Sequence, residues 1–131
     1  MIFVDSGAFL GRLIQQDQHH TSAVLGWKHV RRDVVTSSLV LTETFTLLGR
    51  WVDHAFAAAW AREVLNSSAM EIFRPGKADE LAALELFTEY ADKKIGFVDC
   101  VSFALMRRHG IRRAFTFDRH FEDAGFERWP G

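Results

Sequence analysis

The first five residues, Met1-Ile2-Phe3-Val4-Asp5, decide the fold of this chain. Four consecutive apolar residues predict a short strand that is buried on both faces, as found inside a parallel sheet. Asp5 follows the apolar run directly, and an acid straight after a buried strand is rarely there for solvation alone. In open α/β sheets the carboxyl ends of the strands form the edge where ligands bind. We therefore expect a functional site beside Asp5.

The rest of the chain alternates between extended and helical patterns. We expect further strands at residues 33–36, 70–73 and 114–117, with a last extended segment at 126–129. Apolar residues at helical spacing predict helices at residues 8–17, 21–31, 39–50, 55–65, 79–90 and 99–110, with a short helical turn at 119–123. This alternation predicts an α/β fold, a three-layer α/β/α sandwich around a mostly parallel sheet, in a single domain over residues 1–131.

Two helices carry apolar residues whose orientation the spacing predicts. On the alanine-rich helix 55–65, Phe56 and Trp60 share one side, and helical spacing predicts that Trp60 lies either in the core or at a dimer interface. This side is therefore a candidate homodimer surface. On the helix 79–90, the glutamates are expected to face solvent, and three large apolar residues are expected to face inward: Leu81, Leu84 and Phe87.

Composition and charge limit the class of protein. The chain has 131 residues, of which 48% are hydrophobic and 13% aromatic, so it is compact rather than disordered. A net charge of -1 gives no overall basic signature for nucleic acid, although a cluster of acids would offset nearby arginines in this sum. One cysteine, Cys100, excludes an internal disulfide framework and favours a reducing compartment.

No targeting or membrane segment is predicted. The first residues lack the charged and apolar regions of a secretory signal. No window approaches the roughly 18 to 20 consecutive apolar residues that a membrane helix needs. We expect a cytoplasmic protein that does not enter a membrane.

Three further acids fall at similar junctions of the predicted elements. Glu43 lies near the start of the helix 39–50, Asp99 at the start of the helix 99–110, and Asp118 directly after the strand 114–117. In a parallel sheet these junctions share one edge, so the four carboxylates can converge around Asp5. Four anions without compensation would force one or more to take up a proton, and a divalent cation removes that cost. Ligation by oxygen alone favours Mg²⁺ or Mn²⁺, which suits hydrolysis of a phosphodiester by in-line attack.

Each acid also has a simpler interpretation. Asp99 and Asp118 could each cap the helical turn beside them. Glu43 could form a surface ion pair with Arg50 or Arg12. The specific signal is the conjunction of the four acids rather than any one of them.

Four segments appear in a characteristic order over nearly the whole chain: Ile2-Phe3-Val4-Asp5-Ser6, the helix with Glu43, Gly96-Phe97-Val98-Asp99-Cys100-Val101-Ser102 and Phe115-Thr116-Phe117-Asp118-Arg119-His120-Phe121. Together they resemble PIN-domain proteins, and most of all the VapC-type toxins of bacterial and archaeal toxin–antitoxin pairs. The resemblance implies that the four acids act as catalytic residues in RNA cleavage, with Mg²⁺, or Mn²⁺, held by Asp5, Asp99 and Asp118. It also implies a homodimer and a small antitoxin protein whose tail fills the active-site groove.

The resemblance and the spacing suggest supporting residues. Ser6 matches a hydroxyl that follows the first acid in the family, and Thr116 matches one placed two residues before the fourth. Ser102 lies one helical turn after Asp99 and could bond a carboxylate or a water on the metal. Gly7 stands where the family often has a polar residue, so no contact is expected from it.

Basic residues cluster in sequence around two of the acids. Lys93, Lys94 and Arg119 are candidates for contacts with RNA phosphates, and the alternative is that they are solvated charges. His120 could touch the substrate or pack on the surface. The pair His19-His20 fits a polar turn better than a metal site, because adjacent side chains diverge and no third ligand is near in sequence.

Other functions fit the residues less well. A haloacid-type phosphatase needs a second aspartate two residues after the first, and this chain has Gly7 there. A receiver-like domain would need a lysine at a strand end, and no clear candidate is present. A catalytically silent PIN-like module that binds RNA or protein remains the alternative. Missing acids would favour that module, and all four are present.

Overall fold

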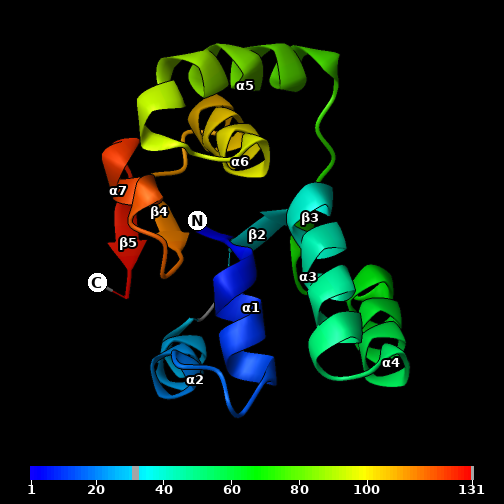
Figure 1. Cartoon of the computed structure of the whole chain (residues 1–131). Coiled ribbons are helices and arrows are strands. Elements are labelled where there is room, and N and C mark those ends of the chain that lie inside the picture. The colour runs from blue at the N-terminus through cyan, green and yellow to red at the C-terminus, as the bar shows by residue number, and fades with distance from the viewer. Residues whose placement is uncertain (31–32, 131) are drawn as a thin grey trace.

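A five-stranded sheet forms the centre of the computed structural model, which describes residues 1–30 and 33–130 (Figure 1). The strands are β1 (Ile2–Val4), β2 (Val34–Ser37), β3 (Glu71–Phe73), β4 (Arg113–Phe115) and β5 (Glu127–Trp129). All four pairings are parallel, and the order across the sheet is β3-β2-β1-β4-β5. The predicted parallel sheet is confirmed, and the last extended segment joins it as an edge strand.

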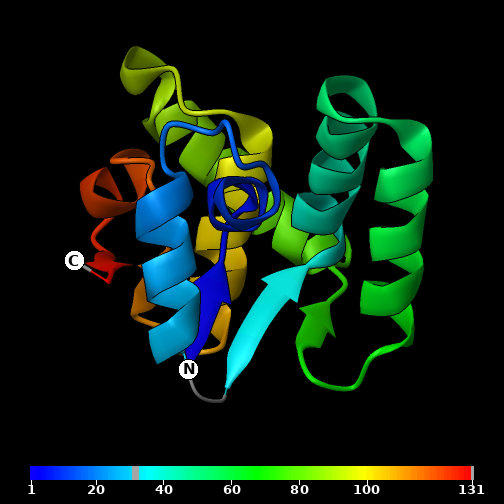
Figure 2. The same cartoon turned by 90° about the horizontal axis from the view of Figure 1, so that it is seen from below.

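Helices cover both faces of this sheet. They are α1 (Ser6–Leu13), α2 (His20–His29), α3 (Ser38–Trp51), α4 (His54–Asn66), α5 (Lys77–Glu89), α6 (Phe97–Arg108) and α7 (His120–Asp123), with a short 3₁₀ helix, η1 (Ala91–Lys93). Helices α1 to α4 lie on one face and α5 and α6 on the other (Figures 1 and 2). The three-layer α/β/α sandwich is therefore confirmed.

The ends of some elements differ from their predicted positions. Helix α2 ends at His29, and Arg31, where its end was predicted, lies outside the described residues. Strand β4 ends at Phe115 rather than at Phe117. The Phe117 ring instead stacks on the His19 ring, with 4.4 Å between the centroids. Within the described ranges, no helix combines the length and the apolar character that crossing a membrane requires.

The direction of the chain across the sheet reverses between β1 and β4. From β1 the chain moves outward to β2 and β3, and it then returns to the other side of β1 to form β4 and β5. The carboxyl ends of β1 and β2 point to the top of Figure 2. Val4 lies in register with Phe115, and the backbone N–H of Asp5 donates to the carbonyl oxygen of Phe115 over 3.1 Å. Such a reversal is where open α/β sheets bind their ligands.

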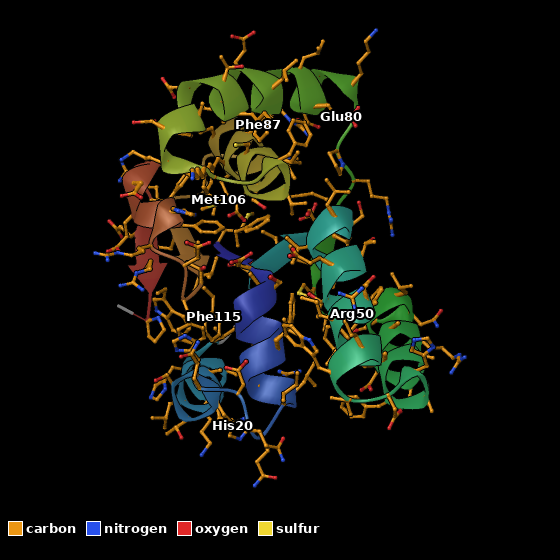
Figure 3. The ribbon with its side chains drawn as sticks, in the orientation of Figure 1. His20, Arg50, Glu80, Phe87, Met106 and Phe115 are labelled. Carbon is orange, nitrogen blue, oxygen red and sulfur yellow. The ribbon has the colours of Figure 1, made fainter. Side chains whose placement is uncertain are left out.

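The core is built from aromatic and aliphatic side chains between the sheet and its helices. Met106 and Phe115, both labelled in Figure 3, are fully buried. Trp60 is only 8% exposed and packs edge-on against Phe9 at 5.3 Å and Phe45 at 5.7 Å. The predicted homodimer surface is therefore wrong for Trp60, and the alternative that Trp60 lies in the core is confirmed, because the protein's own core already covers this side chain.

Helix α5 presents the opposite face from the one predicted. Leu81, Leu84 and Phe87 are 53%, 48% and 42% exposed. The buried face carries Ala83 and Leu86, together with an acid, Asp79. Asp79 accepts two hydrogen bonds from Arg108 of α6, over 2.7 and 3.1 Å. The prediction was wrong because a small residue and an ion pair lie on the face of α5 that packs on α6, while the larger apolar residues lie on the exposed face.

Candidate metal centre

Asp5 lies at the bottom of the site, directly after β1. Its side chain is buried, and its Oδ2 accepts a hydrogen bond of 2.9 Å from the hydroxyl of Thr116. The backbone N–H of Ser6 also donates to this carboxylate, so Ser6 contributes its main chain here. Burial raises the pKa of Asp5 to about 6, although both hydrogen bonds act in the opposite direction. The carboxylate is thus held in place by the residues around it and is costly to ionise.

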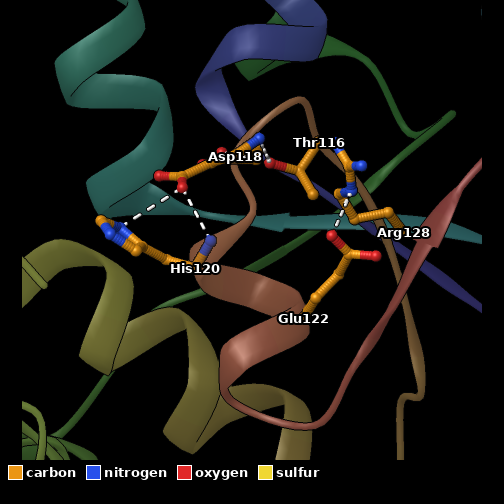
Figure 4. A network of polar contacts seen from close by, with 6 residues as sticks. Thr116, Asp118, His120, Glu122 and Arg128 are labelled. Carbon is orange, nitrogen blue, oxygen red and sulfur yellow. Dashed lines mark hydrogen bonds and ion pairs between the residues drawn. The ribbon is translucent and has the colours of Figure 1, made fainter. Parts of the chain in front are cut away.

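Thr116 connects two of the predicted acids. While its hydroxyl donates to Asp5, the same oxygen accepts the backbone N–H of Asp118 over 3.0 Å (Figure 4). This arrangement requires the chain to leave the sheet after Phe115, because a residue inside the strand would direct its backbone to the neighbouring strands. The early end of β4 therefore sets the geometry of the site.

Asp99 lies in the first turn of α6, whose N-cap is Gly96. The simpler interpretation of Asp99 as the helix cap does not hold, because the helix begins at Phe97. Burial, and after it the charges of Asp5, Asp118 and Glu43, together raise the pKa of Asp99 to about 8. A carboxylate in the first turn is normally favoured by the helix dipole. The surrounding acids and burial outweigh that effect.

Asp118 combines a turn-forming contact with a place in the site. Its Oδ1 accepts the backbone N–H of His120 over 2.9 Å, which closes the turn that leads into α7, whose N-cap is Arg119. The Nδ1 of His120 lies 3.3 Å from the same oxygen. The charge of Asp118 also raises the pKa values of Asp5 and Asp99, which places all three acids together.

Glu43 completes the group of acids from α3. Burial raises its pKa, and its charge in turn raises the pKa values of Asp5 and Asp99. Within the described parts of the chain, neither Arg50 nor Arg12 forms an ion pair with it. The Arg12 guanidinium instead lies 4.4 Å from the centre of the Trp27 ring. The alternative of a surface ion pair is therefore not observed.

Other predicted residues lie around or away from these acids. Ser102 is buried, and its hydroxyl donates to the carbonyl oxygen of Val98 over 3.2 Å, so the predicted bond to a carboxylate is replaced by one within its own helix. Lys93 and Lys94 are exposed on the connection that precedes α6. Arg119 lies at the site itself.

A pocket opens beside the acids. It has a volume of about 390 Å³ and is lined by Asp5, Ser6, Gly7, Phe117, Asp118 and Arg119. Two larger pockets, of about 430 and 460 Å³, are lined by none of the four acids. We regard the smaller pocket as the functional one, because charged groups that repel each other face it.

The donor groups suit a divalent cation. Ligand atoms of Asp99, Asp118 and His120 lie within 4.8 Å of one another, which is close enough to surround one ion. Burial and mutual repulsion raise the pKa values of Asp5 and Asp99, and a bound cation would offset both effects. His120 was expected only as a substrate contact or as a surface residue. The sequence does carry one signal that His120 could be a ligand. It follows Asp118 by two residues in a tight turn, and such a turn brings its ring back toward that acid.

Comparisons with known proteins agree with this geometry. The family model of the PIN domain matches residues 2–127. The chain is 36% identical over 126 residues to the 23S rRNA-specific endonuclease VapC20 of Mycobacterium tuberculosis, covering 96% of this chain and 95% of that protein.

Solved structures give the same result. A crystal structure of VapC20 from Mycobacterium tuberculosis, described as a sarcin-ricin loop cleaving toxin, superposes with a TM-score of 0.90 at 34% identity, covering 96% of each chain. A toxin–antitoxin complex from Klebsiella pneumoniae matches with a TM-score of 0.66 at 13% identity, covering 91% of this chain and 88% of that one, and so supports the fold alone. The sheet is doubly wound and carries four acids at its reversal point, and the family model matches nearly the whole chain. The chain therefore belongs to the PIN domain family.

Proposed function

We propose that this protein is a divalent-metal-dependent endoribonuclease that acts as the toxin of a toxin–antitoxin pair. The observation that supports the proposal most is the convergence of four carboxylates at the reversal point of the sheet, where burial and mutual repulsion raise the pKa of Asp99 to about 8. Identity of 36% to a 23S rRNA-specific endonuclease supports RNA as the substrate class. Ribosomal RNA is therefore the first RNA to test.

The four acids have two different roles in this proposal, metal binding and proton transfer. Asp5, Asp99 and Asp118 would hold Mg²⁺, with Mn²⁺ as an alternative, because carboxylate oxygens suit these ions. When bound, such an ion neutralises the carboxylates, orients a phosphate and makes a water molecule more acidic. Glu43 is the most exposed of the four, and its carboxylate would be the group that accepts the proton of an attacking water.

Other residues support these roles. The hydroxyl of Thr116 and the backbone of Ser6 hold the carboxylate of Asp5 in place. The guanidinium of Arg119, at the wall of the pocket, binds an RNA phosphate, and Lys93 and Lys94 add positive charge beyond it.

The proposed partners follow from the same assignment. A small antitoxin would inhibit the enzyme by covering the pocket, and the active form would be a homodimer. RNA as the substrate and the single cysteine both support a cytoplasmic location for this protein. A single PIN domain, residues 1–131, would contain the whole site. No observation favours the catalytically silent alternative, since all four acids are in place.

Cleavage of RNA by purified, antitoxin-free protein tests the proposal. Total cellular RNA would be incubated with the protein in Mg²⁺, in Mn²⁺ and in EDTA. We expect cutting with either metal and none in EDTA. Asp99→Asn should lower the rate by more than the roughly 10- to 100-fold typical of residues that only support a metal ligand. Asp92→Asn, which changes an exposed acid on η1, is the matched control and should cut normally. Cutting that persists in EDTA, or in Asp99→Asn at the normal rate, would refute the proposal.

A further inference from the structure

Among the residues that the structure describes, His120 is the one histidine whose ring lies beside the acids of the candidate metal centre. It begins helix α7, and the bond of 2.9 Å from its backbone N–H to Asp118 fixes its position relative to that acid (Figure 4). The side chains of His120 and Asp118 are 33% and 37% exposed. The ring therefore lies on the open side of the cluster, where an ion from solvent can reach it.

The distances around the ring match those between ligands of one ion. With bonds of about 2.1 Å, neighbouring ligand atoms in an octahedral shell are about 3.0 Å apart, and opposite ones about 4.2 Å apart. The Nδ1 of His120 lies 3.3 Å from Oδ1 of Asp118, and suitable atoms of Asp99, Asp118 and His120 all lie within 4.8 Å of one another. Small movements of these side chains are sufficient to enclose an ion.

Asp5 does not belong to this closely spaced set. Its Oδ2 is bonded to the hydroxyl of Thr116, and its side chain is buried below the other acids. On the solvent side of the site, Asp99 and Asp118 therefore supply two carboxylates, and the donor that lies beside them there is the nitrogen of His120.

We propose that the imidazole of His120 binds the metal ion directly beside Asp99 and Asp118, as a ligand additional to the three carboxylates of Asp5, Asp99 and Asp118. The proposal rests on the metal dependence given under Proposed function and adds a ligand that the order of the four acids does not predict. A nitrogen ligand favours Mn²⁺ over Mg²⁺, because affinity for nitrogen rises along the series of divalent transition metals and Mg²⁺ prefers oxygen. The alternative is that the ring only donates a hydrogen bond to Asp118.

Pulsed electron paramagnetic resonance on the Mn²⁺-loaded full-length protein distinguishes these two roles. Unlabelled protein would be compared with protein that carries ¹⁵N only in its histidines. We expect a histidine nitrogen coupling to Mn²⁺ that changes with the label and is lost in His120→Asn. This variant keeps a side-chain N–H close to the Nδ1 position, so it preserves a purely structural hydrogen bond to Asp118. His29→Asn, at an exposed position on α2, is the control and should keep the coupling.

Titration calorimetry on the same proteins gives a second measure. His120→Asn should weaken Mn²⁺ binding by about 10-fold, and Mg²⁺ binding by less than about 3-fold. Bound Mn²⁺ without a histidine coupling would overturn the inference and leave the nuclease proposal intact. Equal Mn²⁺ affinity in His120→Asn and the unmodified protein would also overturn it. A coupling in a protein that cleaves no RNA would support the inference while the proposed function failed.

Discussion

A single hydroxyl organises the acids at the scale of the residue. Thr116 is buried, donates to Asp5 over 2.9 Å and accepts the backbone N–H of Asp118 over 3.0 Å. It thereby joins the end of β1 to the segment after β4. The bond to Asp5 also lowers the pKa of that acid against the effect of burial, so it favours the charged form that a metal needs.

Thr116→Val removes this hydroxyl and keeps the shape of the side chain. The carboxylate of Asp5 and the N–H of Asp118 then lose their buried partner, so we expect the free energy of unfolding to fall by about 1–3 kcal/mol. We also expect Mg²⁺ affinity near neutral pH to fall by about 10-fold, because the pKa of Asp5 rises. Urea denaturation and calorimetry measure the two effects. Thr116→Ser keeps the hydroxyl and should restore most of both, and normal Mg²⁺ binding by the valine variant would contradict this account.

At the scale of the element, α5 shows that apolar spacing alone does not determine which face is buried. Two sets of apolar residues follow the helix, and the larger one, with Leu81, Leu84 and Phe87, faces outward. The smaller set packs on α6, and the ion pair between Asp79 and Arg108 attaches the start of α5 to the end of α6. Packing against α6 determines which face of α5 is buried, and the local sequence of α5 carries no information about α6.

A matched pair of leucines tests this orientation. Leu86 is 8% exposed and Leu84 is 48% exposed on the same helix. Leu86→Ala should lower the free energy of unfolding by about 2–4 kcal/mol, because it leaves a cavity against α6. Leu84→Ala should change it by less than about 0.5 kcal/mol. Urea denaturation at two protein concentrations measures both, and a cost for Leu84→Ala equal to that for Leu86→Ala at the lower concentration would contradict the orientation of α5.

At the scale of the whole molecule, the buried acids make the stability of the metal-free protein depend on pH. Ordinary aspartates have a pKa of 3.8, whereas the pKa values of Asp5 and Asp99 are raised to about 6 and about 8. Between pH 4 and 8 the folded state therefore retains protons that the unfolded state has lost. Stability falls as pH rises through this range, because ionisation of the two acids is opposed only in the folded state.

Thermal unfolding in EDTA at pH 5 and at pH 8 measures this effect. We expect the melting temperature of the unmodified protein to fall by several degrees between these two pH values relative to that of Asp99→Asn, which lacks the acid with the highest of these pKa values. Added Mg²⁺ should raise the melting temperature more at pH 8 than at pH 5, because it binds the ionised carboxylates. Identical pH dependence in the two proteins would contradict the repulsion between these acids.

The sequence by itself determined the parallel α/β fold and the edge of the sheet at which the acids meet. Both depend on local patterns, because a short apolar run followed by Asp5 predicts a buried strand and its functional end, and parallel strands bring successive ends to one edge. Only the tertiary structure decided that Ser102 bonds within its own helix, that Trp60 lies in the core rather than at a dimer interface, and that His120 turns toward Asp118. The direction of each of these side chains depends on where its element ends and on which partner packs against it. Residues distant in the chain supply that information, and the pattern around each position does not contain it.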